Sequence, residues 1–325
     1  MPILGRMCGH GGDGPVGRRS CDTETGSASG SVAALGRVIG RLLFGGSQLA
    51  SAAAGYPSWF HPKPSLTRWR CAPEEKVVNR RTSNPQRCHD AVTTFVATHV
   101  VRANRSSNGA LSSWFYTGAP SEELNGVLRL GGAAPHEIEQ LRKLFDGVPA
   151  CWHFWPDIDA PEIPGLLRRR GLELFETEPL MVLADANQVA YRELGQPERI
   201  EYVTGAAGLT EWAGLWSGAT DTNGLVTGLR QGMDRASTRY LLWREHDEVL
   251  GCAAVVSSGV GASLEHIVTR ADHRGRGIGT ALTRRALALA LEAGARRVVL
   301  TASPDGEGIY RRLGFVTVGH VERYA

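Results

Sequence analysis

Residues 273–279 read His-Arg-Gly-Arg-Gly-Ile-Gly, and the expected fold follows from this stretch. It comes after an apolar segment, 264–269, that is typical of a strand, and before 280–293, whose apolar residues recur at helical spacing. Alternate glycines let a backbone turn tightly with its amides pointing inward. Those amides would meet the positive end of the helix dipole. The stretch is interpreted as an anion-binding loop for a phosphate or pyrophosphate, the alternative being an ordinary strand-to-helix turn.

Two other phosphate-binding loops do not fit this stretch. A Walker A loop ends in Gly-Lys-Ser/Thr, whereas this loop ends Gly279-Thr280 without a lysine. The dinucleotide fingerprint needs Gly-x-Gly-x-x-Gly and an acidic residue at the end of the next strand. The glycines here stand at 275, 277 and 279, and the next strand ends Val-Leu-Thr-Ala at 299–302. Both classes of nucleotide site are therefore excluded.

The motif Arg274-x-x-Gly277-x-Gly279 resembles the acetyl-coenzyme A (acetyl-CoA) signature of the GCN5-related N-acetyltransferases (GNATs). A second family signature, Tyr-x-x-x-Gly-Phe, matches Tyr310–Phe315 downstream. The resemblance covers about 200–325 and implies an α/β GNAT fold, a central mixed twisted sheet flanked by helices. One departure is Arg270-Ala271, where family members often have a proline before the loop.

The resemblance also implies which residues act. The loop amides would hold the pyrophosphate of acetyl-CoA, the preceding strand would bind the pantetheine arm, and Arg274 and Arg276 would add cationic contacts. The implied coenzyme-binding residues are Ile267, Val268, Thr269, Arg274, Gly275, Arg276, Gly277, Ile278, Gly279 and Thr280.

Two residues are the catalytic candidates. Tyr310 would protonate the leaving thiolate, because an unperturbed phenol and thiol differ by only roughly 1.5 pKa units. Glu265 stands nine positions before Arg274, where the family often has an acidic residue, and would act as the base directly or through water. Since side chains alternate along a strand, His266 is expected on the opposite face. The alternative to a catalytic role is a structural one: Tyr310 would be an ordinary half-buried tyrosine, and Glu265 a carboxylate paired across the sheet.

The region before residue 200 is divided as follows. Residues 1–89 are expected to be a disordered extension, because 13 glycines fall within the first 55 residues. Residues 90–188 resemble a degenerate second GNAT copy, and 198–325 are the expected catalytic domain, with a polar linker between the two. Both halves carry an apolar strand ending at Pro-Asp, then a short helix and a glycine. Leu167 replaces Tyr310 in this repeat, so the first half should neither bind acetyl-CoA nor catalyse.

Composition narrows the function classes. The net charge is +3, yet 12 basic and 6 acidic residues fall within 1–90, so the remainder carries slightly more acid than base. We therefore expect no nucleic-acid partner. No apolar run reaches the roughly 18 residues of a membrane span, so no membrane partner is expected. Six cysteines without a CxxC pair predict reduced thiols, no metal site and a cytoplasmic protein. Cys252 lies on an apolar strand and is read as core.

The first expectation is an acetyl-CoA-dependent N-acetyltransferase for a small-molecule amine, acting as a monomer or homodimer. Protein N-terminal or lysine acetylation and a non-catalytic acyl-CoA sensor are the alternatives. Acceptor contacts are expected within about 210–235. Side chains there that would shape an amine pocket are Trp212, Trp216, Asp221 and Asp234, although the tryptophans also fit a core and Asp221 a helix cap.

Overall fold

A mixed sheet of 11 strands runs through the residues that the computed structural model describes, 84–132, 135–183 and 197–325. The helices are α1 (Pro85–Val101), α2 (Pro135–Leu144), α3 (Ile163–Arg168), α4 (Ala206–Ser217), α5 (Asn223–Asp234), α6 (Ile278–Glu292) and α7 (Pro304–Arg312). The strands are β1 (Arg105–Asn108), β2 (Ser112–Tyr116), β3 (Asn125–Leu130), β4 (Cys151–Phe154), β5 (Leu174–Leu183), β6 (Ile200–Tyr202), β7 (Thr238–Glu245), β8 (Glu248–Ser258), β9 (Gly261–Thr269), β10 (Val298–Thr301) and β11 (Phe315–Tyr324). Single 3₁₀ turns are η1 (Glu122–Leu124), η2 (Pro197–Arg199) and η3 (Ala271–His273).

Helix α1 begins earlier than the sequence predicted. The Asn84 side chain accepts a hydrogen bond from the Gln86 amide, and Pro85 occupies the first helical position. Both features favour a helix start. Residues 85–89 are therefore helical, not part of the disordered extension expected for 1–89; the rest of that extension, up to residue 83, and most of the expected linker lie outside the described residues.

The strand order β1-β2-β3-β4-β11-β5-β10-β9-β8-β7-β6 has a symmetric centre. Strand β5, the last of the first half (α1–β5), pairs antiparallel with β10 of the second half (β6–β11). Strand β11 likewise pairs antiparallel with β4 of the first half, and β5 and β11 pair with each other. Each half thus places its last strand against the other half. The two predicted halves share one continuous sheet. The interpretation of the first half as a GNAT copy stays a prediction.

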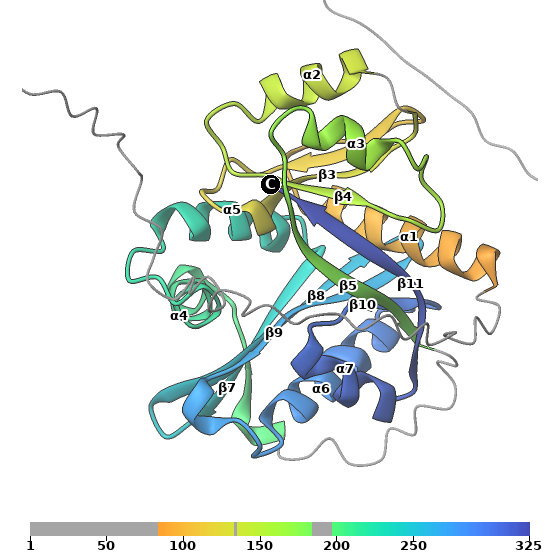
Figure 1. Cartoon of the computed structure of the whole chain (residues 1–325). Helices are drawn as coiled ribbons and strands as arrows, with labels where there is room; N and C mark the ends of the chain where they lie inside the picture. Colours follow the sequence, from red (N-terminus) through yellow and green to blue (C-terminus); the bar gives the residue numbers. More distant parts are fainter. Residues whose placement is uncertain (1–83, 133–134, 184–196) are drawn as a thin grey trace, which may run out of the picture. The chain divides into compact units, whose positions relative to one another are not determined.

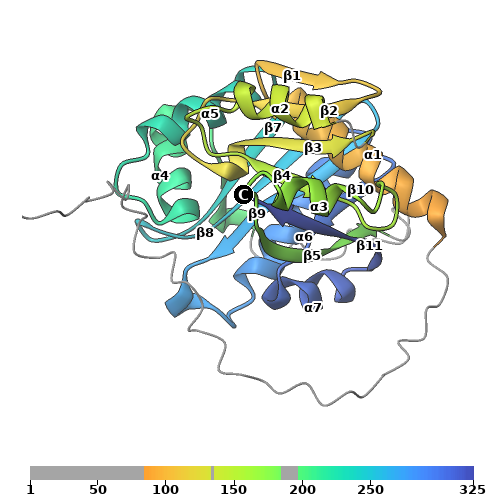
Figure 2. The same ribbon diagram turned by 45° about the horizontal axis from the view of Figure 1, so that its top comes forward.

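Helices cover both faces of this sheet (Figures 1 and 2). Helix α1 packs over the centre, where Phe95 contacts Trp155 and lies in one apolar cluster with Leu180 and Val299. Helices α4 and α5 lie on that same face. Gly261 on β9 approaches α1, and Glu265, four residues on, shares its face and pairs with Ala254 of β8. Ala254 in turn lies in one apolar cluster with residues of α4 and α5. Helices α6 and α7 pack on the opposite face of the second half, and α2 and α3 pack on the first half. Segments far apart in sequence therefore pack together on this sheet.

None of the helices in the described part of the chain combines the length and apolar character needed to cross a bilayer.

Candidate active site

Strands β9 and β10 separate soon after they meet. They pair in parallel only at Val298 with Ala262 and Val299 with Ser263. Beyond these pairs β9 continues to Thr269 beside β8, so its other edge has no strand partner among the described residues. An unpaired strand edge offers backbone amides and carbonyls to an extended ligand. The predicted pantetheine-binding residues, 267–269, lie on this edge.

A β-bulge bends β9 at the point of separation. Ala254 pairs with Glu265 and Cys252 with Val268, so His266 and Ile267 together face one residue of β8. His266 takes a left-handed backbone, with φ 52°, which costs a non-glycine residue roughly 1–2 kcal/mol. A bulge bends its strand and redirects one side chain. The bulge accounts for both the divergence of the strands and the orientation of His266.

The glycine-rich loop has the backbone that its sequence predicted. Gly275 and Gly277 have φ of 77° and 83°, a region in which side chains are strained, and Gly277 is the N-cap of α6. The amides of 275–280 donate no hydrogen bond to any described residue, the first helical bond being from the Ala281 amide to the Gly277 carbonyl. Apart from the adjacent residues of the chain, no atom of the described part of the protein lies within 4 Å of a Cβ added at Gly275 or Gly277. Open amides, a helix N-terminus and free space suit a bound phosphate.

Two arginines flank this loop at the surface. Arg274 Nη1 lies 3.4 Å from Asp305 Oδ2, and Arg276 Nη2 lies 2.8 Å from Glu245 Oε2. Both guanidinium groups are exposed, so these ion pairs contribute little to stability. An arginine held this weakly can turn to a phosphate.

Tyr310 lies on α7, and its side chain is buried between the helix and the sheet. Its ring stacks edge-on with Phe315 at 6.2 Å between centroids and lies against Gly306, where an added Cβ would be 2.9 Å from Cε2. Burial, with smaller contributions from Glu178 and Glu265, raises the pKa of the phenol to about 12. The hydroxyl makes no hydrogen bond with a described residue and stays protonated near neutral pH. It is therefore a free proton donor at the edge of the core.

Glu265 and His266 lie on the same face of the sheet, which corrects the expected opposite orientation. Glu265 Oε1 lies 3.7 Å from His99 Nε2 on α1, while the His266 ring packs on Trp216 at 4.6 Å between centroids on α4. The bulge breaks the alternation on which the expectation rested. Burial, opposed in part by the charge of Arg102, raises the pKa of Glu265. His99 Nδ1 donates to the Phe95 carbonyl, so Nε2 is the acceptor nitrogen that faces Glu265.

A buried arginine from the last strand organises the floor of the site. Arg323 Nη2 lies 3.0 Å from Glu178 Oε2 and 2.9 Å from the Thr301 hydroxyl, and Nη1 lies 3.2 Å from Glu176 and 3.7 Å from Glu123. Burial alone would lower the pKa of Arg323, but these carboxylates raise it. All three carboxylates belong to the first half of the chain. The first half therefore supplies part of the site, even though the glycine-rich loop lies in the second.

The corresponding strand separation in the first half is filled by protein. Strands β3 and β4 also pair in parallel at only two positions. There the fully buried Trp155 donates a hydrogen bond from Nε1 to the Leu128 carbonyl, at 2.8 Å, and takes up the free strand edge. Together with Leu167 in place of the phenol, this leaves the first half without the open edge that the second half has.

Comparisons with known proteins agree with this arrangement. The acetyltransferase (GNAT) family model matches residues 210–315, which include the loop, Tyr310 and the bulged strand. Residues 210–315 are a GNAT acetyltransferase domain. The solved structure of a GCN5-related N-acetyltransferase from Kribbella flavida is similar over 74% of this chain and 94% of its own, at 19% identity and a TM-score of 0.51. A GCN5-related N-acetyltransferase-like protein from Streptococcus suis is similar over 74% and 97%, at 15% identity and a TM-score of 0.51.

These two structures share the fold with this chain, and the fold class expected from the sequence is confirmed. No curated protein matches the sequence.

The acceptor candidates of the GNAT domain divide into two groups. Trp212 is buried and donates from Nε1 to the Ala253 carbonyl, whereas Trp216 contacts His266. Asp221 lies one position before Thr222, the N-cap of α5, and accepts a hydrogen bond from the Asn223 amide. Asp234 forms an exposed pair with Arg230. Only the tryptophans border the site.

Sequence reasoning missed the polar residues that reach the GNAT site from elsewhere in the chain. They are His99, Arg102, Glu123, Glu178 and Arg323. Among these, only Glu178 and Arg323 carry a local signal, because each is a charged residue within an otherwise apolar strand. Cys88, Cys151 and Cys252 are free and buried, and burial raises the pKa of the Cys252 thiol, which confirms Cys252 as a core residue.

Proposed function

We propose that this protein transfers the acetyl group of acetyl-CoA to the primary amine of a small molecule. The observation that carries this proposal is that the backbone amides of 275–280 donate no hydrogen bond to a described residue and lie beside the unpaired edge of β9. A pyrophosphate followed by an arm with two amides, as in coenzyme A, matches both features in that order. When bound, acetyl-CoA supplies an acetyl thioester as the electrophile.

The chain's residues fit this co-substrate. The amides of Gly275 to Thr280 would bind the pyrophosphate, with Arg274 and Arg276 leaving their surface carboxylates to add charge. The backbone of Ile267, Val268 and Thr269 would bind the pantetheine arm. The free space over Gly275 and Gly277 is what a ligand in contact with the backbone requires.

Proton movement falls to two side chains on opposite sides of the strand separation. A carboxyl group with a raised pKa accepts a proton more readily near neutral pH, and this suits Glu265 as the base that removes a proton from the amine. Tyr310 would donate from its hydroxyl to the departing thiolate.

A small acceptor fits the enclosure of the site better than a peptide. Gly224 and Gly228 on α5 approach the first half so closely that an added Cβ would lie 2.8 Å from Pro120 and 2.7 Å from Ala119. This contact closes the side of the site between α5 and the loop after β2. The buried free thiols support a reducing, cytoplasmic location.

The test has two measurements on the purified full chain. Calorimetric titration with acetyl-CoA should show binding, and a thiol-release assay over a library of primary amines and lysine peptides should show turnover with a small amine. Binding without turnover on any amine would favour an acyl-CoA sensor. Turnover restricted to peptides would favour protein acetylation.

A further inference from the structure

Arg102 is a buried cation without a carboxylate partner. It follows α1 directly, and its side chain is 94% buried, since the residue is 6% exposed. Nη2 donates to the Glu123 carbonyl at 2.7 Å, and the guanidinium lies over the Phe115 ring at 4.6 Å from the centroid. No carboxylate oxygen of a described residue comes within 4.0 Å of it. Glu265 and Glu123 act on this charge only from beyond contact distance. A buried charge that no carboxylate contacts is costly, so its retention points to a ligand.

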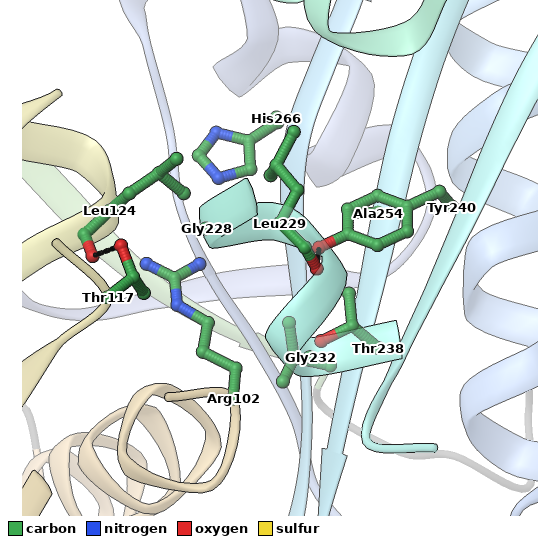
Figure 3. Close-up of a pocket in the computed structure, with 11 residues that line it drawn as sticks. Arg102, Thr117, Leu124, Gly228, Leu229, Gly232, Thr238, Tyr240, Ala254 and His266 are labelled. Carbon is green, nitrogen blue, oxygen red and sulfur yellow. Dashed lines mark hydrogen bonds between the residues drawn. The ribbon is translucent and has the colours of Figure 1, made fainter. Parts of the chain in front are cut away.

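The free side of Arg102 faces a small cavity between the two halves. Figure 3 shows its guanidinium near the His266 ring, with Thr117 and Leu124 to one side and α5 to the other. Three buried polar atoms on this cavity lack a hydrogen-bond partner among the described residues: Arg102 Nε, Thr238 Oγ1 and His266 Nε2. Thr238 is only 4% exposed. Buried polar atoms of native proteins are otherwise nearly always paired.

The chemistry of these atoms favours an anion. Arg102 Nε is a fixed donor, and the Thr238 hydroxyl can turn to donate. Burial lowers the pKa of His266 to about 3, so its ring is neutral and repels no cation or anion by charge. A carboxylate accepts bonds from both kinds of donor and matches the planar guanidinium. Glu265, the proposed base, directly precedes His266 and interacts electrostatically with Arg102.

We propose that the acceptor is an amine that also carries a carboxylate, of the amino-acid class, whose carboxylate binds at Arg102, Thr238 and His266. This rests on the proposed function and specifies the substrate class of the same site. The amine then lies toward Glu265, a few bonds from the carboxylate. The first half of the chain thereby determines acceptor specificity through Arg102, although it does not hold the coenzyme.

The experiment compares matched acceptors in the thiol-release assay. Each pair consists of an amino acid and the amine that lacks only its carboxylate, such as alanine with ethylamine and phenylalanine with phenethylamine. We expect kcat/KM to be at least about tenfold higher for the amino acid of a productive pair, the usual effect of a charge-assisted hydrogen bond. Arg102→Met should bring the ratio of kcat/KM within each pair close to one; because the charge of Arg102 also acts on Glu265, the ratio within the variant is the readout, and not the absolute rate with the plain amine. Arg102→Lys should restore part of the preference.

Two controls keep the test decisive. Arg105→Met, three positions away on an arginine that lies over Tyr116, should keep the wild-type preference. Arg102→Met also loses the hydrogen bond to the Glu123 carbonyl and the contact with the Phe115 ring, so its melting temperature is measured first and the preference is compared in folded protein. If that variant does not fold, Thr238→Val keeps the shape of the side chain, removes one donor and should reduce the preference.

A binding measurement separates the two proposals. With coenzyme A present, amino acids should raise the melting temperature of the wild type and not that of Arg102→Met. Equal turnover of amines with and without a carboxylate would overturn the acceptor class and leave acetyl transfer standing. Absence of any turnover would refute the proposed function, and the melting shift would then decide the anion site alone. An unchanged preference for amino acids in a folded Arg102→Met variant would overturn the carboxylate site at Arg102.

Discussion

Replacing Tyr310 with Phe removes one hydroxyl from the proposed acid and little else. The ring would keep its contacts with Phe315 and Gly306, and the hydroxyl has no hydrogen-bond partner among the described residues to leave unpaired. The free energy of unfolding should therefore change by less than about 0.5 kcal/mol. Turnover should fall, because the thiolate would leave without a protein proton donor.

Burial of Tyr310 sets the size of this effect. With a phenol pKa of about 12 and an ordinary thiol at about 8.5, complete proton transfer is unfavourable by about 5 kcal/mol. The phenol would then assist chiefly by donating a hydrogen bond to the developing thiolate until another proton arrives. General acids contribute about 10²–10⁴-fold, and we expect the lower end, a loss of about 10²-fold in kcat or about 3 kcal/mol.

Saturating kinetics, acetyl-CoA titration and melting are measured on the same samples of wild type, Tyr310→Phe and Tyr116→Phe. Tyr116 lies on β2 in the first half, beneath Arg105, and serves as the matched control that should behave as wild type in all three assays. The acetyl-CoA dissociation constant should stay within about twofold in Tyr310→Phe, since the pyrophosphate loop is untouched. Wild-type kcat in folded Tyr310→Phe would refute the acid role and make water the proton source.

Four other changes test the rest of the structure. Gly277→Val should fold with roughly 1–2 kcal/mol of backbone strain and bind acetyl-CoA at least about tenfold more weakly by calorimetry. The control is Gly294→Val, which has the same φ of 83° at the far end of α6. It should melt at the same temperature as Gly277→Val and bind acetyl-CoA as tightly as the wild type. Arg323→Met should lower the free energy of unfolding by about 3–5 kcal/mol in urea, because it leaves the buried Glu178 carboxylate unpaired. A loss below about 1 kcal/mol would mean that this carboxylate is solvated. The pKa of Tyr310 is about 12 in the folded protein and about 10 in the unfolded chain. Its contribution to stability is therefore complete below about pH 10 and is lost as the pH rises toward about 12. This loss, roughly 2–3 kcal/mol, should be missing from Tyr310→Phe when urea unfolding is measured at alkaline pH. Deleting residues 1–81 should leave the melting temperature unchanged, as expected of a glycine-rich segment, and a drop of several degrees would show that the segment contacts the sheet.

Most helices and strands of the second half were predictable because their signals are local. The apolar runs of β7 and β8, the apolar spacing of α6 and the Ser303-Pro304 start of α7 each operate within one turn or one strand pair. Strand β1, with the polar sequence Arg-Ser-Ser-Asn, was not predicted, because it is held by pairing with β2 and not by its own apolar residues. Helix α5 was not predicted, because glycine disfavours a helix interior. Its glycines lie where the helix approaches the first half too closely for a Cβ.

The same distinction separates the coenzyme loop from the acceptor site. Residues 273–280 determine their own conformation, because positive φ at Gly275 and Gly277 and the start of α6 are short-range properties. The exchange of β5 and β11 depends on which strand edges remain free once both halves have formed, and no local pattern encodes that. The exchange brings Glu178 and Arg323 to the site, and the packing of α1 across the sheet brings Arg102 to the bulge at His266. The sequence by itself determined the turn of the glycine-rich loop into α6. Only the tertiary structure decided which side chains surround the bulge at His266, because that arrangement depends on many weak contacts between distant segments.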